Sequence, residues 1–156
     1  MKQSTSIIVF DRDDSTTLES VKKGLAEVDC EIISCASEEV LLSTIESSRV
    51  DVLVINLEKP FERSFRLLSD IQTKAQETEV IFVAPFDNDT LWAWMEVIQR
   101  GAYEFLPKPF DVEELRYHFI QVSRKHHSLS LRKLPPVGFA KALSSALLGG
   151  MAQAGA

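Results

Sequence analysis

Apolar residues gather in four short runs, and the stretches between these runs repeat apolar residues every three or four positions. Three of the runs are almost continuously apolar, which is typical of strands buried on both faces of a parallel sheet. A fifth, weaker run comes just before Pro107, which we expect to end it. The pattern predicts strands over residues 7–10, 31–34, 52–55, 80–83 and 103–106.

The spacing between these runs is helical, and polar residues stand where such helices would begin. The expected N-terminal caps are Asp14-Ser15, Ser37, Asp89 or Thr90, and Asp111, and Gly101 is expected to end the fourth helix. The inward residues predicted for the five helices are Leu18, Val21, Leu25 and Val28; Val40, Leu41, Thr44 and Ile45; Phe65, Leu68 and Ile71; Leu91, Met95, Ile98 and Ala102; and Leu115, Phe119 and Val122.

Strand and helix alternate five times, and each crossover is long enough for a helix. This order predicts the α/β class: a (βα)5 doubly wound, five-stranded parallel sheet of the flavodoxin/CheY-like type with right-handed crossovers. We expect residues 1–127 to form this domain. Residues 128–156 read as a tail or linker that contains one short helix, with Phe139, Leu143 and Leu147 on one face.

Composition excludes several classes of protein. The chain is 45% hydrophobic and 26% charged and carries a net charge of −6, which argues against nucleic acid or an anionic membrane as a partner. There is no signal-peptide pattern and no apolar run that could span a bilayer, so we expect a cytoplasmic protein. Cys30 and Cys35 are five apart in a predicted strand and should point to opposite faces as free thiols.

Polar residues cluster at the predicted strand ends. Asp11-Arg12-Asp13-Asp14 follows the first strand, Asn56 the third, Ala84 ends the fourth, and Lys108 follows the fifth. In open parallel sheets, sites form outside the carboxyl ends of the strands, so these positions should converge. Carboxylates beside one lysine are the usual donors for Mg²⁺ and phosphate.

The segment 101–111, Gly-Ala-Tyr-Glu-Phe-Leu-Pro-Lys-Pro-Phe-Asp, is similar to the "GAYDFLPKPF" of receiver domains in bacterial two-component response regulators, notably those attached to σ54-dependent activators. Residues 51–55 resemble the strand before the phospho-accepting aspartate of that family, and Pro60 lies four residues beyond the acceptor position. The resemblance implies a cytoplasmic (βα)5 domain that takes phosphate from a histidine kinase on one aspartate with Mg²⁺.

The same resemblance exposes departures from the family pattern. Asn56 stands at the acceptor position, Ala84 at that of the hydroxyl residue, and Arg12 where the second acidic residue is usual. Lys108 is retained, and Phe105 occupies the aromatic switch position. A carboxamide is not the nucleophile that acyl phosphate formation needs, so the sequence predicts a pseudo-receiver with no catalytic residue and no enzyme activity.

The degenerate pocket should bind no cofactor, with at most weak Mg²⁺ binding at Asp11 and Asp13. Arg12 or Lys108 is expected to supply the positive charge that Mg²⁺ supplies elsewhere, by neutralising Asp13 or Asp14. Lys108 is also expected to pair with Asp11. The Lys108-Pro109 peptide resembles one that is cis in the family.

The chain should act through protein contacts in a two-component-type pathway, independently of phosphorylation. Trp92, Glu96 and Gln99 share one outer face of the fourth helix. In the family, the fourth helix, fifth strand and fifth helix form the common partner face, which suggests a homodimer there. Tyr103 and the solvated helix residue His118 are expected to extend this face, and Trp94 is expected to pack inward.

Two alternatives stay open. In one, a neighbouring aspartate such as Asp11 or Asp13 still takes phosphate in a phosphorelay. In the other, the chain is the N-terminal regulatory domain of a larger transcriptional regulator, although the sequence itself holds no helix-turn-helix or ATPase motif.

Overall fold

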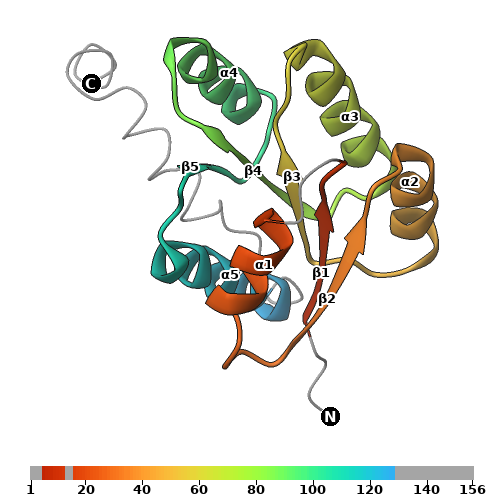
Figure 1. Ribbon diagram of the computed structural model, residues 1–156. Helices are drawn as coiled ribbons and strands as arrows, with labels where there is room; N and C mark the ends of the chain where they lie inside the picture. The colour runs from red at the N-terminus through yellow and green to blue at the C-terminus, as the bar shows by residue number, and fades with distance from the viewer. Residues whose placement is uncertain (1–4, 13–15, 129–156) are drawn as a thin grey trace, which may run out of the picture.

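The computed structural model describes residues 5–12 and 16–128 and contains one five-stranded parallel sheet in the order β2-β1-β3-β4-β5 (Figure 1). Strands and helices alternate in chain order as β1 (Thr5–Phe10), α1 (Thr16–Gly24), β2 (Cys30–Cys35), α2 (Glu38–Ser47), β3 (Val52–Asn56), α3 (Phe61–Lys74), β4 (Glu79–Pro85), α4 (Asn88–Gln99), β5 (Glu104–Lys108) and α5 (Val112–Ser128). This confirms the predicted fold class. The predicted cap at Asp14-Ser15 and the predicted short helix of the tail lie outside the described residues.

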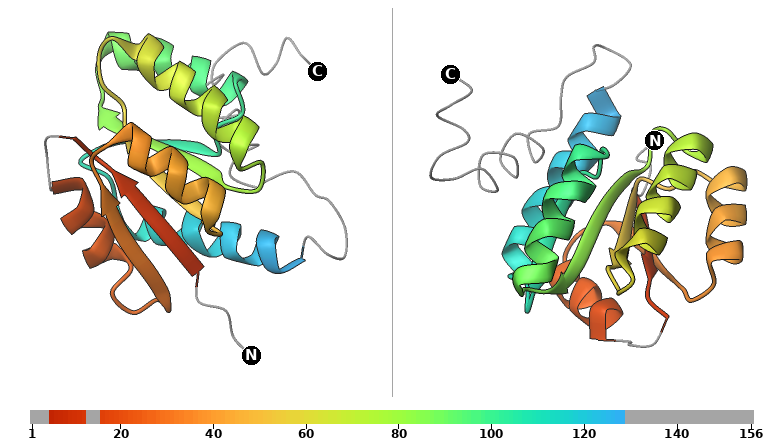
Figure 2. Two further views of the ribbon diagram at one scale, coloured as in Figure 1. Left: turned by 90° about the vertical axis from the view of Figure 1, so that its right-hand side faces the viewer. Right: turned by 90° about the horizontal axis from the view of Figure 1, so that it is seen from above.

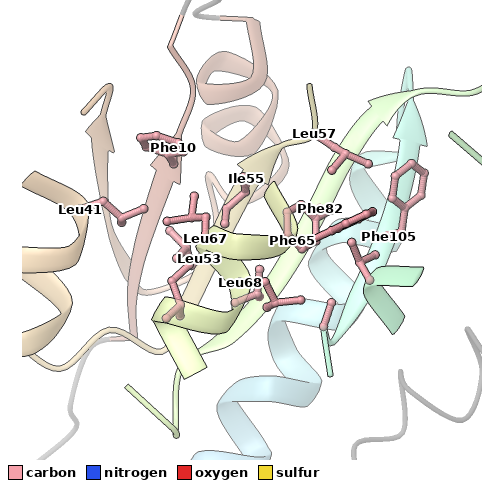
Figure 3. Packing of buried hydrophobic residues seen from close by; sticks show 14 of the residues in the cluster. Phe10, Leu41, Leu53, Ile55, Leu57, Phe65, Leu67, Leu68, Phe82 and Phe105 are labelled. Carbon is pink, nitrogen blue, oxygen red and sulfur yellow. The ribbon is translucent and has the colours of Figure 1, made fainter. Parts of the chain in front are cut away.

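Helices α2, α3 and α4 cover one face of the sheet, and α1 and α5 cover the other (Figure 2). Each face has its own hydrophobic core, because successive residues of a strand point to opposite sides. Phe10, Leu53 and Phe82 belong to the α2–α4 side, where they pack with Leu41 and Leu68 (Figure 3). The alternate strand residues join α1 and α5 on the other side: Ile7, Val9, Val52, Val54, Ile81, Val83 and Leu106.

The caps of the helices agree with the sequence at α2 and α5. The Ser37 side chain accepts a hydrogen bond from the Val40 amide, and Asp111 accepts one from the Glu113 amide at 2.8 Å. The prediction for α4 is wrong by two or three residues: Asp87, and not Asp89 or Thr90, is the cap. Asp87 forms a reciprocal capping box with Thr90, whose amide lowers the pKa of the Asp87 carboxyl.

Two side-chain placements and the end of one strand also differ from the sequence prediction. Leu91 is 40% exposed and Val40 is 56% exposed, because α4 buries Ala93 and Val97 and α2 buries Leu41 and Ile45. The strand β5 continues through Pro107 to Lys108. Proline is tolerated there because β5 is an edge strand, where one side of the backbone needs no hydrogen-bond partner.

Cys30 and Cys35 are free and lie at the two ends of β2. Cys30 packs against the core on the α1–α5 side and Cys35 against the core on the α2–α4 side, as the spacing predicted. Burial raises the pKa of the Cys30 thiol, with Asp29 as a second cause. Within the described residues, no helix is long and apolar enough to cross a membrane.

Gly101 ends α4 with a backbone φ of 103°, a left-handed conformation that side chains disfavour. A Cβ at this position would lie 2.4 Å from Gln72 Nε2, and the same Gln72 amide donates to the Arg100 carbonyl at 2.7 Å. The positive φ therefore favours glycine at this turn, and a side chain there would also displace the Gln72 amide from the Arg100 carbonyl.

We predict that Gly101→Ala lowers the free energy of unfolding by about 1–2 kcal/mol from backbone strain alone, measured by urea denaturation. Gln72→Ala separates the two grounds, because it removes the clash and leaves the strain. If Gly101→Ala costs nothing in the Gln72→Ala background, the backbone explanation is wrong.

Candidate functional site

The predicted site positions converge at the edge formed by the carboxyl ends of the strands. Asn56 is the last residue of β3 and pairs in register with Val83, and Ala84 pairs with Pro107 on β5. Arg12 follows β1, the neighbour of β3 on the other side. The parallel register therefore brings residues 12, 56, 84 and 108 onto four adjacent strand ends. Asp13 and Asp14 lie outside the described residues.

Asn56 presents an amide where a carboxylate would be needed as a nucleophile. Its Nδ2 donates to Glu58 Oε1 over 3.4 Å, and its Oδ1 is buried with no hydrogen-bond partner. A buried acceptor left without a donor is costly, so this atom is a weak point in the site. The amide has no negatively charged oxygen that could attack phosphorus as a nucleophile.

Arg12 forms an ion pair with Glu38, the first residue of α2, and its guanidinium lies 5.6 Å from the centre of the Phe10 ring. Arg63, in the first turn of α3, reaches the same Glu38 oxygen at 3.4 Å. One carboxylate is thus shared by two guanidinium groups. The described partner of Arg12 is Glu38, whereas the predicted partners, Asp13 and Asp14, lie outside the described residues.

Lys108 is half-buried at the end of β5 and forms no ion pair with any residue that the structure describes. The expected pair with Asp11 is therefore wrong; Asp11 is also half-buried, and its amide donates to the Cys35 carbonyl at 3.1 Å. The Lys108-Pro109 peptide is cis, as is Lys59-Pro60.

The donors in the described part of this site fit Mg²⁺ poorly. Asp11 offers a carboxylate, but Asn56 offers a neutral oxygen and Arg12 brings a fixed positive charge. The described residues contain no group of three or more histidine, cysteine, aspartate or glutamate side chains that could hold a metal. A cation would have to be bound against the charge of Arg12.

A small hollow lies beside Asn56 on the α2–α3 side, with about 30 Å³ of free space. It is lined by Phe10, Arg12, Glu38, Ile55, Asn56, Glu58, Lys59, Pro60, Arg63, Ser64 and Leu67. Arginine and lysine residues outnumber acidic ones in this lining, three to two. The polarity of the site is therefore opposite to that of a cation pocket.

Aromatic packing encloses Phe105, the residue at the predicted switch position. Phe105 is 1% exposed, and Trp94 stacks on it with ring centres 5.1 Å apart and an angle of 21° between the planes. Phe86 meets the other side of Trp94 edge-on at 6.3 Å. The prediction that Trp94 packs inward is confirmed, and Ala84, completely buried in the same core, offers no hydroxyl toward the pocket.

Trp92 lies against α3, and not toward β5 and α5 as predicted. Its ring is 5.6 Å from that of Phe65 and 6.4 Å from that of Phe61, and the residue stays 53% exposed. One turn further along α4, the Glu96 carboxylate forms an ion pair with the Arg100 guanidinium at 2.8 Å. The Arg100 guanidinium lies 4.8 Å from the centre of the Phe65 ring. The helical spacing correctly put Trp92 and Glu96 on one face of α4. Because α3 packs against that side of α4, the face lies between α3 and α4 and not toward β5.

An open hollow of about 370 Å³ adjoins Trp92 at the N-terminal ends of α3 and α4. Lys59 and Asp89 form an ion pair of 2.7 Å across it, and this hydrogen bond raises the pKa of Lys59. The remaining lining residues are Pro60, Phe61, Glu62 and Asn88. Trp92 is thus an exposed aromatic side chain beside a concave surface.

Tyr103 and His118 are buried, at 2% and 0% exposure, so the prediction that they extend an exposed face is wrong. Their rings meet edge-on at 5.8 Å, and His118 Nε2 lies 3.4 Å from Glu104 Oε2. The reason is that α5 covers β5 from one side and turns His118 inward. The apolar residue that α5 does expose is Tyr117, at 39%.

Sequence reasoning missed Glu38 and Arg63 as residues of the site and placed Ser64 in the loop after β3, whereas Ser64 lies in α3. Glu38 looked like an ordinary first-turn residue of α2, a position that suits an acidic side chain in any helix. Arg63 and Ser64 lie on α3, more than 50 residues from Arg12. Only the juxtaposition of β1, α2 and α3 brings these side chains around Asn56.

Comparison with known proteins agrees with this architecture. Residues 7–119 match the family described as "Response regulator receiver domain". The chain is 29% identical over 110 residues to the DNA-binding transcriptional regulator NtrC of Bradyrhizobium sp. (strain RP501 Parasponia), which covers 70% of this chain and 22% of that protein. It is also 29% identical over 121 residues to the two-component response regulator ORR26 of Oryza sativa subsp. japonica, covering 76% and 20%. The chain spans about a fifth of the length of these relatives.

Solved structures share the fold. The signal receiver domain of an HD domain-containing protein from Pseudomonas fluorescens Pf-5 superposes with a TM-score of 0.71 at 21% identity, covering 85% of this chain and 96% of that one. A response regulator from Thermotoga maritima gives a TM-score of 0.67 at 18% identity, covering 77% and 98%. With the family match over residues 7–119 and the five-stranded parallel sheet, the chain belongs to the response regulator receiver domain family.

Proposed function

We propose that this receiver domain is a phosphorylation-independent interaction module that binds protein partners of a two-component pathway in the cytoplasm. The observation that carries the proposal is the amide of Asn56 at the acceptor position, held toward Glu58 at 3.4 Å. The domain then regulates through contacts and has no catalytic residue. In this proposal the domain is a pseudo-receiver, because it keeps the receiver fold but lacks the acceptor aspartate in its pocket.

The charges around Asn56 support this reading. Arg12 stands where a second acid would help to hold Mg²⁺, and its guanidinium is fixed by Glu38 and by the Phe10 ring. Phosphoryl transfer needs a nucleophile and a cation to balance the developing charge, and this arrangement opposes both. The described residues therefore favour a pocket that has lost phosphoryl chemistry.

The aromatic packing around Phe105 supports a single signalling state. A ligand changes a conformation only when it binds one state better than the other. Ala84 has no hydroxyl to donate to a phosphoryl group, and Trp94 holds Phe105 inward by a stacked contact worth about 0.5–1.5 kcal/mol beyond its buried area. The pocket and the outer surface are consequently uncoupled, and partner binding is constitutive.

The partner surface that the geometry favours is the α3–α4 hollow beside Trp92. Exposed tryptophan next to a concave surface is a common centre of binding energy. The face formed by α4, β5 and α5 remains the competing surface for a homodimer, and it offers exposed Leu91 and Tyr117 on α4 and α5. Variants of Trp92 and Leu91 distinguish the two surfaces.

A second function is favoured by the lengths of the relatives. The NtrC proteins are named DNA-binding transcriptional regulators, and this chain covers 22% of the Bradyrhizobium protein. We propose as the alternative that the domain regulates an effector region encoded with it. Sequencing of the full gene at its native locus tests this, and an uninterrupted reading frame into a DNA-binding region is the supporting result.

Incubation with a small phosphodonor and Mg²⁺, followed by intact-mass measurement, should give no added phosphate. Asn56 has no carboxylate to form an acyl phosphate. A phosphorylated species that disappears in Asp11→Asn would support the phosphorelay alternative. A species that maps to the loop after β3 would contradict the proposal directly.

Asn56→Asp should restore only weak Mg²⁺ binding, seen as a small Mg²⁺-dependent rise in melting temperature. The new carboxylate supplies one ligand charge, but Arg12 still repels the cation. Adding Arg12→Asp to Asn56→Asp should increase the effect clearly. Equal Mg²⁺ responses from the single and double variants would show that Arg12 does not oppose the metal.

Trp92→Ala should weaken partner association, or self-association if that occurs, by about thirtyfold, since losing a central tryptophan commonly costs about 2 kcal/mol or more. Asp11→Ala should leave association unchanged if pocket and surface are uncoupled. Leu91→Ala is the matched control for the competing face. A large loss for Leu91→Ala with none for Trp92→Ala would move the interface to α4, β5 and α5, and an equal loss for Asp11→Ala in a folded protein would refute uncoupling.

A further inference from the structure

The hollow beside Asn56 is lined by cationic groups that come from three different segments. Arg12 follows β1, Lys59 lies between β3 and α3, and Arg63 belongs to the first turn of α3. The Lys59 ammonium pairs with Asp89, whereas the guanidinium groups of Arg12 and Arg63 both pair with Glu38, which also lines the hollow. Guanidinium groups present paired N–H donors that match the oxygens of carboxylates and phosphates.

The start of α3 adds neutral donors to the same hollow. Pro60 precedes the helix and no side chain caps it, so the first-turn amides have no partner from a capping group. Ser64, one turn into the helix, lines the hollow and is 8% exposed, and its hydroxyl is a neutral group that can donate to a ligand oxygen.

Asn56 completes the lining with an amide that can serve either polarity. Its buried Oδ1 has no donor, and its Nδ2 makes only a long contact of 3.4 Å to Glu58. An N–H donor held only by a contact of this length can donate instead to an anion that reaches it.

Glu38 already places one anionic group among these donors, since its carboxylate binds Arg12 and Arg63 together. The remaining free space of about 30 Å³ is that of roughly two water molecules. A tetrahedral oxyanion with several oxygens therefore needs the space and the donors that the Glu38 carboxylate now uses. Glu38 lies at the start of α2 and is one-third exposed, so its side chain can turn toward solvent.

We propose that this hollow is a reversible binding site for a small oxyanion of the phosphate class, and that Glu38 is a built-in carboxylate that competes with the ligand for Arg12 and Arg63. The site is noncovalent and requires neither Mg²⁺ nor an aspartate at position 56. It holds whether or not Trp92 binds a partner. Free phosphate and the phosphate group of a small monoester both belong to this class of ligand.

The test is binding of inorganic phosphate to the whole chain by calorimetry and by thermal shift, against chloride at equal ionic strength so that general screening is matched. Methyl phosphate forms a second arm that distinguishes free from esterified phosphate, and binding of either supports the proposal. Arg63→Gln should weaken phosphate binding about tenfold or more, since it removes a charge-assisted hydrogen bond. Arg66→Gln, an exposed arginine on the same helix, is the matched control and should change nothing.

The distinctive expectation concerns Glu38. Glu38→Gln should tighten phosphate binding about tenfold, because it removes the competing charge from both guanidinium groups. Glu39→Gln makes the same change of net charge in the same turn of α2, on an exposed residue outside the hollow, and should have little effect. If Glu38→Gln and Glu39→Gln behave alike, or if Arg63→Gln binds phosphate as well as the unmodified chain, the proposal is wrong. Absence of phosphate binding in both the unmodified chain and Glu38→Gln would also overturn it.

Discussion

Burial of the central strands on both faces is the constraint on which the remaining structure depends. Ile8 and Ile7, neighbours on β1, belong to different cores, and the same alternation holds along β3 and β4. Each strand can bury both faces only if helices cover both sides of the sheet, and parallel neighbours then require helical crossovers. All five strand ends consequently open at one edge, and the polar loops of the chain meet there. The convergence of these side chains at one edge follows from this packing.

The charged side chains at that edge are arranged around the Glu38 carboxylate. Arg12 and Arg63 share Glu38, and this network links the end of β1 to the starts of α2 and α3. Half-exposed ion pairs contribute little stability individually, so the value of the network lies in where it holds the guanidinium groups. They lie beside Asn56, where a pocket for a cation would need negative charge. This placement of positive charge is the basis of the anion site proposed above.

The aromatic side chains around α4 form two separate clusters. Phe86 meets Trp94 edge-on and Trp94 stacks on Phe105, so these three rings form one cluster that reaches from exposed Phe86 to buried Phe105. Phe61, Phe65 and Trp92 form a second cluster between α3 and α4, covered by Arg100. The first cluster buries Phe105, and the second presents the Trp92 side chain to solvent. The two tryptophans, only two positions apart in sequence, therefore have different physical roles.

The sequence by itself determined the five strands, the helices between them and the positions that meet at the strand ends. These follow from local rules: the apolar runs at 52–55 and 80–83, the caps at Ser37 and Asp111, and the left-handed turn at Gly101. Even the grouping of Trp92 with Glu96 on one helical face is a local property, because the helical period fixes it.

Only the tertiary structure decided which neighbour each face meets. The spacing cannot tell whether Trp92 faces α3 or α5, and it cannot show that α5 turns His118 inward beside Tyr103 and Glu104. The shared Glu38 carboxylate was equally hidden, since Arg12 and Arg63 lie 51 residues apart and meet only when β1 and α3 pack around α2. Periodicity in the chain fixes what is buried, whereas the relative placement of the helices on the sheet fixes which charges and rings come together.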